Sequence, residues 1–206
     1  MSGIELAALA GAVARAKARM ATLEQELNLA DSRLGDGDTG VMLARVVDAM
    51  AAIDYAAEPD IGAALGLMAR KTASATGSSL GTLIATGLLT VSKRVKGEPA
   101  IAYADLGGHI AAVVAAMAAR GGATLGDKTV LDILDALARA LDGKGDGASA
   151  ASAAVEACRT TLAEFRDRPC RIGRARMFAE KSIGMDDPGM LAVHELVLAI
   201  AAPATA

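Results

Sequence analysis

The chain has 206 residues, a length that suits one domain or at most two small ones. Apolar residues make up 53% of it, but only 2% are aromatic and Trp is absent, so the core has to be built from aliphatic side chains and Met. This composition favours packed helices and argues against a β-sandwich, whose strands are rich in β-branched and aromatic residues. The formal net charge of −3, with no basic stripe, argues against a nucleic-acid partner.

Features of membrane and secreted proteins are also missing from the sequence. No apolar run approaches the roughly 20 residues that a membrane-spanning helix needs, and the N-terminal segment lacks the basic region that begins a signal peptide. Cys158 and Cys170 are too few for a disulfide framework and lack metal-ligand spacing, so we expect two reduced thiols. The sequence therefore predicts a cytoplasmic protein that does not associate with a membrane.

Helical periodicity dominates the chain from end to end. The predicted helices cover residues 4–29, 40–53, 61–71, 79–95, 105–119, 129–141, 149–165 and 188–201. Asp60 and Pro188 are typical helix starts, and Asp105 is a candidate cap for the fifth helix. No long strand pattern and no repeat period is present. Because the connections are short, we expect antiparallel helical neighbours in one all-α domain over residues 1–206, arranged as a bundle or a closed barrel.

The loop after the first predicted helix, ADSRLGDGDTG, concentrates carboxylates at Asp31, Asp36 and Asp38. Like charges about 4 Å apart repel by roughly 4 kcal/mol at the effective dielectric near a protein surface, so such a cluster needs a cation. Oxygen ligands favour magnesium or calcium, but an EF-hand loop beginning at Asp36 would require Glu where Val47 stands. Spacing alone leaves two interpretations: a magnesium site completed by phosphates, or a solvated turn in which Asp38 caps the next helix.

Two later loops combine glycine with small polar residues. TASATGSSLGT, residues 72–82, precedes a helix whose N-terminal N–H groups suit an anion, although close packing of helices through small residues explains it as well. RGGATLGDKT, residues 120–129, is similar to a Walker A motif, but Asp127 occupies the position of the invariant Lys and no strand precedes it. A P-loop fold is therefore excluded.

The C-terminal segment and the two histidines carry weaker signals. IGRARMFAEKSIGMDDPGM contains Arg174, which suits a phosphate, while its Asp-Pro-Gly run also fits a plain helix start. His109 and His194 lie in apolar helical patterns and are interpreted as packed or surface residues. No catalytic residue is assigned, and we expect any nucleophile or covalent anchor on another chain.

Four segments in this order, LADSRLGDGDTG, ATGSSLGT, GDKTVLDIL and GRARMFAEKSIGMDDPG, together resemble the nucleotide-binding L subunit of dihydroxyacetone kinases, the DhaL or Dak2 family. The resemblance implies an eight-helix antiparallel barrel with the nucleotide site at one end. It also implies two magnesium ions that link the aspartates to the phosphates of ADP or ATP. By motif match the metal ligands are Asp31, Asp36 and Asp38. The implied nucleotide contacts are Thr39, Gly40, Ala75, Thr76, Gly77, Gly121, Val130, Arg174, Asp187 and Gly189.

The resemblance implies a phosphotransferase that acts only with a partner. In the family a separate K subunit binds dihydroxyacetone covalently through a histidine. The donor is ATP in one branch; in the other, bound ADP is rephosphorylated by a phosphotransferase-system protein. We therefore predict the nucleotide-binding subunit of a small keto-sugar kinase, and leave open whether the chain forms a homodimer.

Three positions depart from the family pattern. Thr39, Met42 and Val130 replace the usual His, Asn and adenine-side Met, while the metal ligands are intact. Because of these changes, the identity of the sugar substrate and of the phosphoryl donor is not predicted. They also motivate an alternative function, a non-catalytic nucleotide-sensing adaptor. DGDTG also resembles the related domain of bacterial fatty-acid kinases, so a phosphotransfer domain of that kind is a further alternative.

Overall fold

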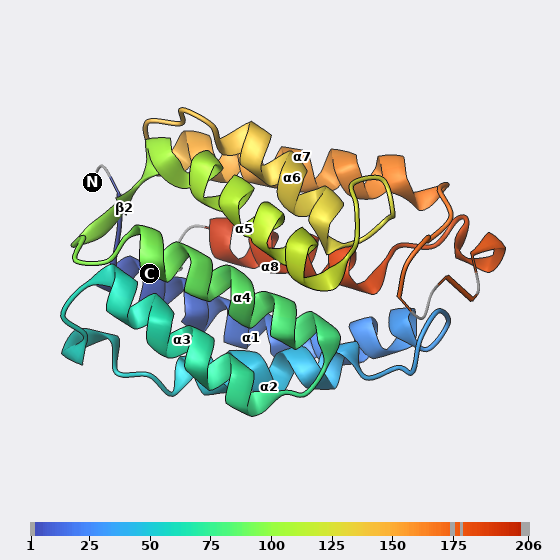
Figure 1. The fold of residues 1–206 in the computed structure, drawn as a ribbon, viewed down its shortest axis with the longest axis horizontal. Helices are drawn as coiled ribbons and strands as arrows, with labels where there is room; N and C mark the ends of the chain where they lie inside the picture. Colours follow the sequence, from blue (N-terminus) through green and yellow to red (C-terminus); the bar gives the residue numbers. More distant parts are fainter. Residues whose placement is uncertain (1–2, 174–175, 178, 203–206) are drawn as a thin grey trace.

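The structure is a computed structural model that describes residues 3–173, 176–177 and 179–202. Within these residues it contains eight α-helices and two three-residue strands, joined by loops and short 3-10 turns (Figure 1). The helices are α1 (Leu6–Asp31), α2 (Thr39–Ala51), α3 (Ile61–Ala75), α4 (Ser79–Arg94), α5 (Leu106–Gly121), α6 (Val130–Leu141), α7 (Gly147–Arg166) and α8 (Pro188–Ala201). The strands are β1 (Gly3–Glu5) and β2 (Ala100–Ala102), and the 3-10 turns are η1 (Tyr55–Ala57), η2 (Tyr103–Asp105) and η4 (Glu180–Ser182).

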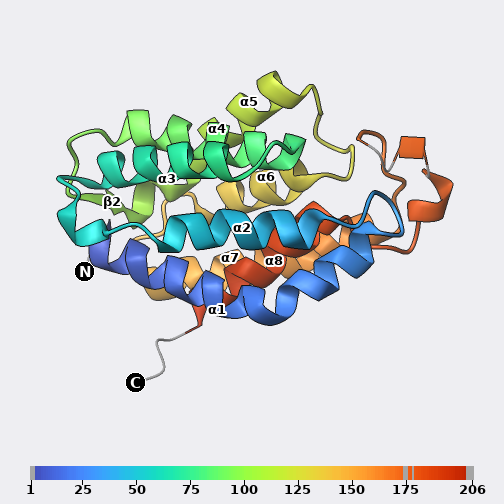
Figure 2. The same ribbon diagram turned by 90° about the horizontal axis from the view of Figure 1, so that it is seen from below.

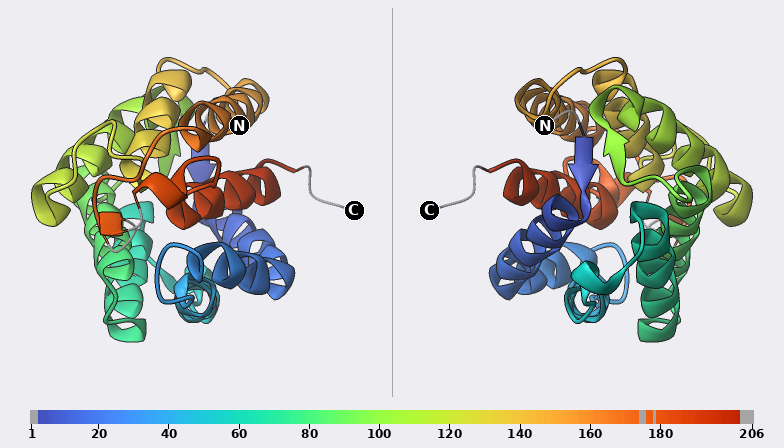
Figure 3. Two further views of the ribbon diagram at one scale, coloured as in Figure 1. Left: turned by 90° about the vertical axis from the view of Figure 1, so that its right-hand side faces the viewer. Right: turned by 90° about the vertical axis from the view of Figure 1, so that its left-hand side faces the viewer.

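The helices form a closed ring. Each helix packs against the next one in the chain, and α8 packs back against α1 (Figures 2 and 3). Successive helices run in opposite directions, as expected for short connections (Figure 1). The all-α, eight-helix antiparallel barrel expected from the sequence is confirmed.

This alternation decides which loops are neighbours. The connections that follow the odd-numbered helices all lie at one end of the barrel, on the right in Figure 1. They cover residues 32–38, 76–78 and 122–129 and the described part of 167–187, which is 167–173, 176–177 and 179–187. The three glycine-containing loops and the C-terminal segment singled out in the sequence therefore meet at the same end, although they are far apart along the chain.

The core consists of two groups of buried apolar side chains. One lies mainly among α1, α2 and α3, and the other among α6, α7 and α8. Tyr55 and Phe165 are the only aromatic residues among the described buried members, which agrees with the aliphatic core predicted from composition. Cys158 and Cys170 are both buried and free, as expected for reduced thiols. None of the described helices combines the length and apolar character that a membrane span requires.

The N-terminal boundary of the first helix was predicted wrongly. Instead of opening a helix, Ile4 lies in β1 opposite Ile101 of β2, in an antiparallel pair. Gly3 approaches β2 so closely that a Cβ there would lie 2.6 Å from the Ile101 carbonyl oxygen. Strands of three residues are too short to show an alternating pattern, and their pairing joins segments nearly 100 residues apart, so local sequence did not reveal them.

Helix ends follow the capping residues at most positions. The Asp60 carboxylate accepts a hydrogen bond from the N–H of Ala63 at 2.7 Å and begins α3, as predicted. Asp105 also precedes its helix, but its side chain makes no capping hydrogen bond, so that expectation was wrong. The predicted end of α3 at residue 71 was early, because the helix continues through the small residues to Ala75.

Candidate functional site

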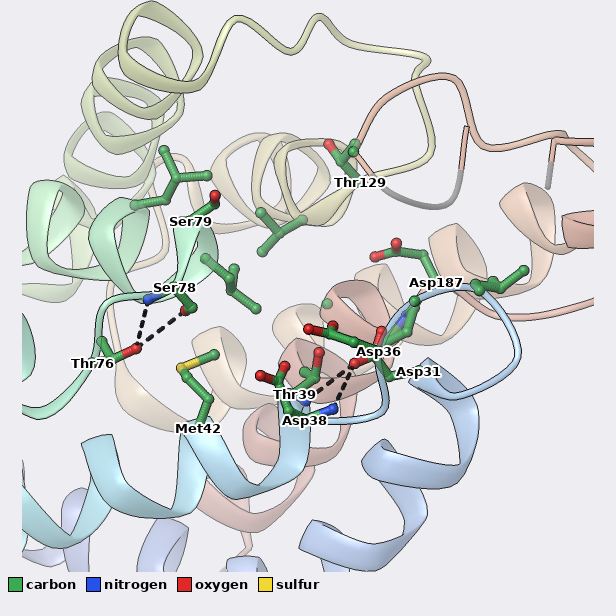
Figure 4. Close-up of a pocket in the computed structure, with 18 of the residues that line it drawn as sticks. Asp31, Asp36, Asp38, Thr39, Met42, Thr76, Ser78, Ser79, Thr129 and Asp187 are labelled. Carbon is green, nitrogen blue, oxygen red and sulfur yellow. Dashed lines mark hydrogen bonds between the residues drawn. The ribbon is translucent and has the colours of Figure 1, made fainter. Parts of the chain in front are cut away.

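An open pocket of about 1060 Å³ lies at the end of the barrel where the four connections meet (Figure 4). Its volume is at the upper end of the range for small-molecule sites. The first turns of α2, α4, α6 and α8 all contribute to its lining, so four helix N-termini point toward it. Among the described residues, the lining contains no His, Cys, Lys or aromatic side chain.

Three carboxylates gather at one side of this pocket. Each member of the acidic triad (Asp31, Asp36 and Asp38) offers an oxygen atom, and these atoms all lie within 4.8 Å of one another. Asp31 is buried, whereas Asp36 and Asp38 are exposed toward the pocket (Figure 4). Three hard oxygen donors at this spacing suit a magnesium ion, which commonly takes its remaining ligands from water and phosphate.

Asp31 and Asn28, near the end of α1, cap the start of α2. Asp31 Oδ2 accepts hydrogen bonds from the backbone N–H groups of Asp38 and Thr39, at 3.0 and 3.2 Å. Asn28 Oδ1 accepts those of Gly40 and Val41, at 2.8 and 3.2 Å. These four bonds satisfy the N–H groups that a helix leaves unpaired at its N-terminus.

Asp38 occupies the N-cap position of α2, but its side chain makes no capping hydrogen bond there. The alternative of a turn capped by Asp38 does not describe the structure. Asn28 was missed in the sequence, where its only signal is a polar side chain placed three residues before Asp31.

Two glycines of the first motif allow close approaches. A Cβ on Gly35 would overlap Asp31 Oδ1, so this glycine lets the loop turn tightly around the buried carboxylate. A Cβ on Gly40 would overlap the carbonyl oxygen of Glu24, at the point where α2 crosses α1. Gly40 is buried and does not line the pocket, so its visible role is helix packing.

The α3–α4 loop is fixed by its own hydroxyl groups. The N–H of Ser78 donates to Thr76 Oγ1 at 3.0 Å (Figure 4). The N–H of Gly81 donates to Ser78 Oγ, also at 3.0 Å. Ser78 thereby caps α4, and Ser79 and Leu80 bring the first turn of α4 to the pocket. A Cβ on Gly81 would overlap the methyl group of Thr76. The loop thus combines the two proposed features, close packing and a helix N-terminus facing the pocket.

The opposite side of the pocket is formed by the starts of α6 and α8. Thr129 and Asp132 form a reciprocal capping box that begins α6, which places Val130 at the pocket. Asp187 caps α8 by accepting a hydrogen bond from the N–H of Met190 at 2.9 Å. Burial raises the pKa of Asp187 to about 6, although hydrogen bonds from the N–H groups of Met190 and Gly189 oppose this shift.

The structure brings most of the predicted site residues together. Those that line the pocket are Asp31, Asp36, Asp38, Thr39, Ala75, Thr76, Gly77, Val130, Asp187 and Gly189. Gly121 ends α5 behind Leu83, which does line the pocket. Arg174 lies outside the described residues, but its neighbours Gly173 and Arg176 line the pocket.

Several lining residues were not predicted as site residues. Arg45 and Leu83 lie one or more turns along α2 and α4, and Ile172 and Met177 come from the long α7–α8 connection. Helical spacing could have indicated Arg45, which lies three residues after Met42 and seven residues after Asp38 on the same face of α2. The positions in the long connection had no such periodic signal.

A family model of the DAK2 domain matches residues 33–202. The chain belongs to the DAK2 domain family. The resemblance recognised from the four sequence motifs is thereby confirmed.

Relatives of this DAK2 chain include whole kinases and separate subunits. It is 36% identical over 190 residues to L-erythrulose 1-kinase of Mycolicibacterium smegmatis, covering 86% of this chain and 32% of that protein. It is 30% identical over 160 residues to the PTS-dependent dihydroxyacetone kinase, ADP-binding subunit DhaL of Lactococcus lactis, covering 77% of each. The DAK2 chain thus spans about a third of the erythrulose kinase and about three quarters of the DhaL subunit.

A solved structure has the same fold. The crystal structure of the dihydroxyacetone kinase from C. freundii in complex with AMP-PNP and Mg2+ superposes with a TM-score of 0.73 over 93% of this chain, which spans 33% of that chain. The two sequences are 23% identical over this match. This likeness establishes the helical fold of the DAK2 chain independently of its sequence motifs.

Proposed function

We propose that this DAK2 chain is the nucleotide-binding subunit of a small keto-sugar kinase, and that residues 1–206 act as one domain. It would present magnesium-bound ADP or ATP to a sugar held by a partner. The observation that carries the proposal is the acidic triad, whose three carboxylate oxygens lie within 4.8 Å of one another beside a pocket large enough for a nucleotide. The names of the relatives, an ADP-binding subunit and an erythrulose kinase, support the same activity.

The acidic triad would hold the metal. The Asp31 carboxylate is held by hydrogen bonds from the N–H groups of Asp38 and Thr39. Asp36 and Asp38 extend from the loop that turns tightly around Asp31 at Gly35. We propose two magnesium ions, because one divalent ion would leave three carboxylates and a di- or triphosphate with a large net negative charge. Bound magnesium would neutralise charge on the phosphates during transfer.

The rest of the pocket divides into a polar and an apolar part. The phosphates would lie between the triad and the first turn of α4, where Thr76, Ser78 and Ser79 add hydroxyl groups to the N–H groups of the helix. The nucleoside would then lie toward the aliphatic residues Leu83 and Val130, and Val130 lies beside Gly189 in the first turn of α8. Adenine would pack against these aliphatic side chains, since the described lining contains no aromatic ring.

The sugar would be bound by another chain. Covalent binding of a carbonyl needs a nucleophile, and the described lining has no His, Cys or Lys. His109 lies at the opposite end of the barrel, where its Nδ1 faces the Arg94 guanidinium, and His194 lies on α8 beside Glu195. We therefore propose a sugar-binding K subunit as partner, and a phosphotransferase-system protein as a further partner if ADP stays bound throughout.

Calorimetry with ADP and ATP, with and without magnesium, tests the nucleotide site. We expect magnesium-dependent binding that Asp36→Ala abolishes, while Asp54→Ala, in a loop at the opposite end, leaves it unchanged. Magnesium-dependent binding that survives in Asp36→Ala would overturn the metal assignment.

Reconstitution with a K subunit tests catalysis. We expect phosphorylation of a triose or tetrose that requires both chains. Nucleotide binding without any transfer in that assay would contradict the kinase and favour a sensing role. Mass spectrometry of the gently purified protein separates the two donors, because retained ADP indicates a phosphotransferase-system donor and exchangeable ATP indicates direct transfer.

A further inference from the structure

Lys128, in the loop between α5 and α6, is buried next to the pocket without lining it. Its side chain is 1% exposed. It is also the only residue other than glycine with a positive φ, 61°, among those the structure describes. Such a conformation is uncommon for a residue with a side chain and indicates that the surrounding structure holds the residue in place.

The ammonium group of Lys128 is bound entirely by backbone carbonyl oxygens. Lys128 Nζ donates hydrogen bonds to the carbonyls of Arg166 at 2.9 Å, Arg168 at 2.8 Å and Ser182 at 2.8 Å. An ammonium has three N–H donors, so these carbonyls satisfy all of them. The lysine of the GDKT motif therefore does not extend to the phosphate region.

Burying this charge is costly, because the ammonium loses its hydration. Removal from water lowers the pKa of Lys128, while the nearby carboxylates of Asp186 and Asp187 oppose the shift. An aliphatic residue at this position would avoid the desolvation penalty, so packing of the core does not require a lysine here. The ammonium instead forms hydrogen bonds to three backbone carbonyls, which belong to residues up to 16 positions apart in the chain.

Other hydrogen bonds fold the same segment around this group. The N–H of Arg171 donates to the carbonyl of Asp127 at 3.0 Å, directly beside Lys128, and the N–H of Gly184 donates to the carbonyl of Arg166 at 2.9 Å. The N–H of Cys170 donates to the buried Ser182 Oγ at 2.8 Å. The segment before α8 is thus tied both to itself and to the α5–α6 loop.

This segment carries one side of the pocket. The C-terminal wall of the pocket is defined by its described lining residues, which are Ile172, Gly173, Arg176, Met177, Asp187, Pro188 and Gly189. Ile172 and Gly173 follow Arg171 directly, and Asp187 follows Gly184 by three residues. The acidic triad and the start of α4 lie on other elements and have no hydrogen bond to Lys128.

We propose that Lys128 is a positioning residue for the nucleoside, which fixes the C-terminal wall before the ligand arrives and does not act on the metal triad. The inference rests on the proposed nucleotide site. A wall that is already ordered lowers the entropic cost of binding, so loss of the ammonium weakens binding of ligands that use the wall. Ligands held only by the metal triad and the α4 N-terminus are unaffected.

The test compares two ligands in one variant. Calorimetry measures binding of Mg-ADP and of magnesium tripolyphosphate, which has phosphates but no nucleoside, to wild type and to Lys128→Met. We expect Lys128→Met to weaken Mg-ADP binding at least tenfold and to change tripolyphosphate binding less than twofold. Lys96→Met, which makes the same change at an exposed position at the far end of the barrel, is the matched control and leaves both unchanged.

Amide hydrogen exchange of the wild type, followed by NMR in the absence of nucleotide, gives a second measurement that does not depend on the variant folding. We expect the amides of Cys170, Arg171 and Gly184 to be protected, as their hydrogen bonds require. If Lys128→Met does not fold, Lys128→Gln, which keeps an N–H donor, is measured in its place.

Three results would overturn the role of Lys128. In Lys128→Met, binding of Mg-ADP and of magnesium tripolyphosphate could weaken equally, or binding of neither could weaken. In the wild type, the amides at these three positions could be unprotected. Absence of Mg-ADP binding by the wild type would instead overturn the proposed function itself.

Discussion

Asp38→Asn distinguishes the electrostatic repulsion within the metal-free acidic triad from the proposed binding of magnesium by the triad. In the absence of metal, the Asp38 carboxylate lies within 4.8 Å of those of Asp31 and Asp36. Two unit charges at this distance repel by about 0.9 kcal/mol even at the dielectric constant of water. Asn removes both repulsions, and no capping hydrogen bond is lost because the Asp38 side chain makes none.

The expected gain in stability is modest. Two repulsions total roughly 1.7 kcal/mol at the dielectric of water, and salt screens them further. The loss of a negative charge at the N-terminus of α2 takes back about 0.3–1 kcal/mol. The metal-free variant should therefore be more stable than wild type by about 1 kcal/mol, which corresponds to a rise in Tm of roughly 2–4 °C for a chain of this size.

Thermal unfolding in EDTA and in excess Mg-ADP measures both effects. We expect Asp38→Asn to raise Tm in EDTA and to lose most of the increase that Mg-ADP gives to the wild type. Asp31→Ala also removes two repulsions, but the N–H groups of Asp38 and Thr39 lose their acceptor, which costs about 0.5–2 kcal/mol, so this variant should raise Tm in EDTA less than Asp38→Asn does, or not at all. A lower Tm for Asp38→Asn in EDTA, or a full increase with Mg-ADP, would refute a repulsive triad that binds magnesium.

Three further predictions concern other parts of the molecule. Because burial raises the pKa of Asp187 from 3.8 to about 6, ionisation costs the folded state, and the free energy of unfolding should fall by on the order of 3 kcal/mol as pH rises from 4 through 6. Urea unfolding measured across this pH range should show that Asp187→Asn removes this decline. An equal decline of the free energy of unfolding in the variant would contradict the raised pKa of Asp187. Gly81→Ala should cost about 1–3 kcal/mol through overlap with the Thr76 methyl, and Thr76→Ser, which deletes that methyl, should recover most of the loss in the double variant; urea unfolding that shows additive losses would argue against this contact. Burial raises the pKa of Cys158 to about 12 and also that of Cys170, so a thiol reagent such as DTNB should label neither in the native protein and both in urea; rapid native labelling would disagree with their burial.

The helices were accessible to sequence reasoning because their signals are local. Asp60 marked the start of α3, and Pro188 marked that of α8, because these signals depend only on residues within the first turn. The strand pair of Ile4 and Ile101 was not accessible, because its hydrogen bonds join distant segments. The absence of a capping bond from Asp105 likewise depends on side-chain orientation, which periodicity does not determine.

The site was accessible only in part, for a related reason. The spacing of Asp31, Asp36 and Asp38 indicated a metal site but fitted a capped turn equally well. The tertiary structure excludes a cap by Asp38, because Asp31 and Asn28 on the preceding helix cap α2 instead, and the metal site stays a proposal. The role of Lys128 was hidden in the same way, because its three acceptors lie 38 to 54 residues later in the chain.

The sequence by itself determined an all-helical chain, the order of its helices and the residue types that suit magnesium and phosphate. These properties follow from composition, from helical periodicity and from short motifs, all of which act over a few residues. Only the tertiary structure decided that four loops, the first ending at residue 38 and the last beginning at residue 167, form one pocket. The physical reason is the alternating direction of eight helices in a closed ring, which brings every second connection to the same end.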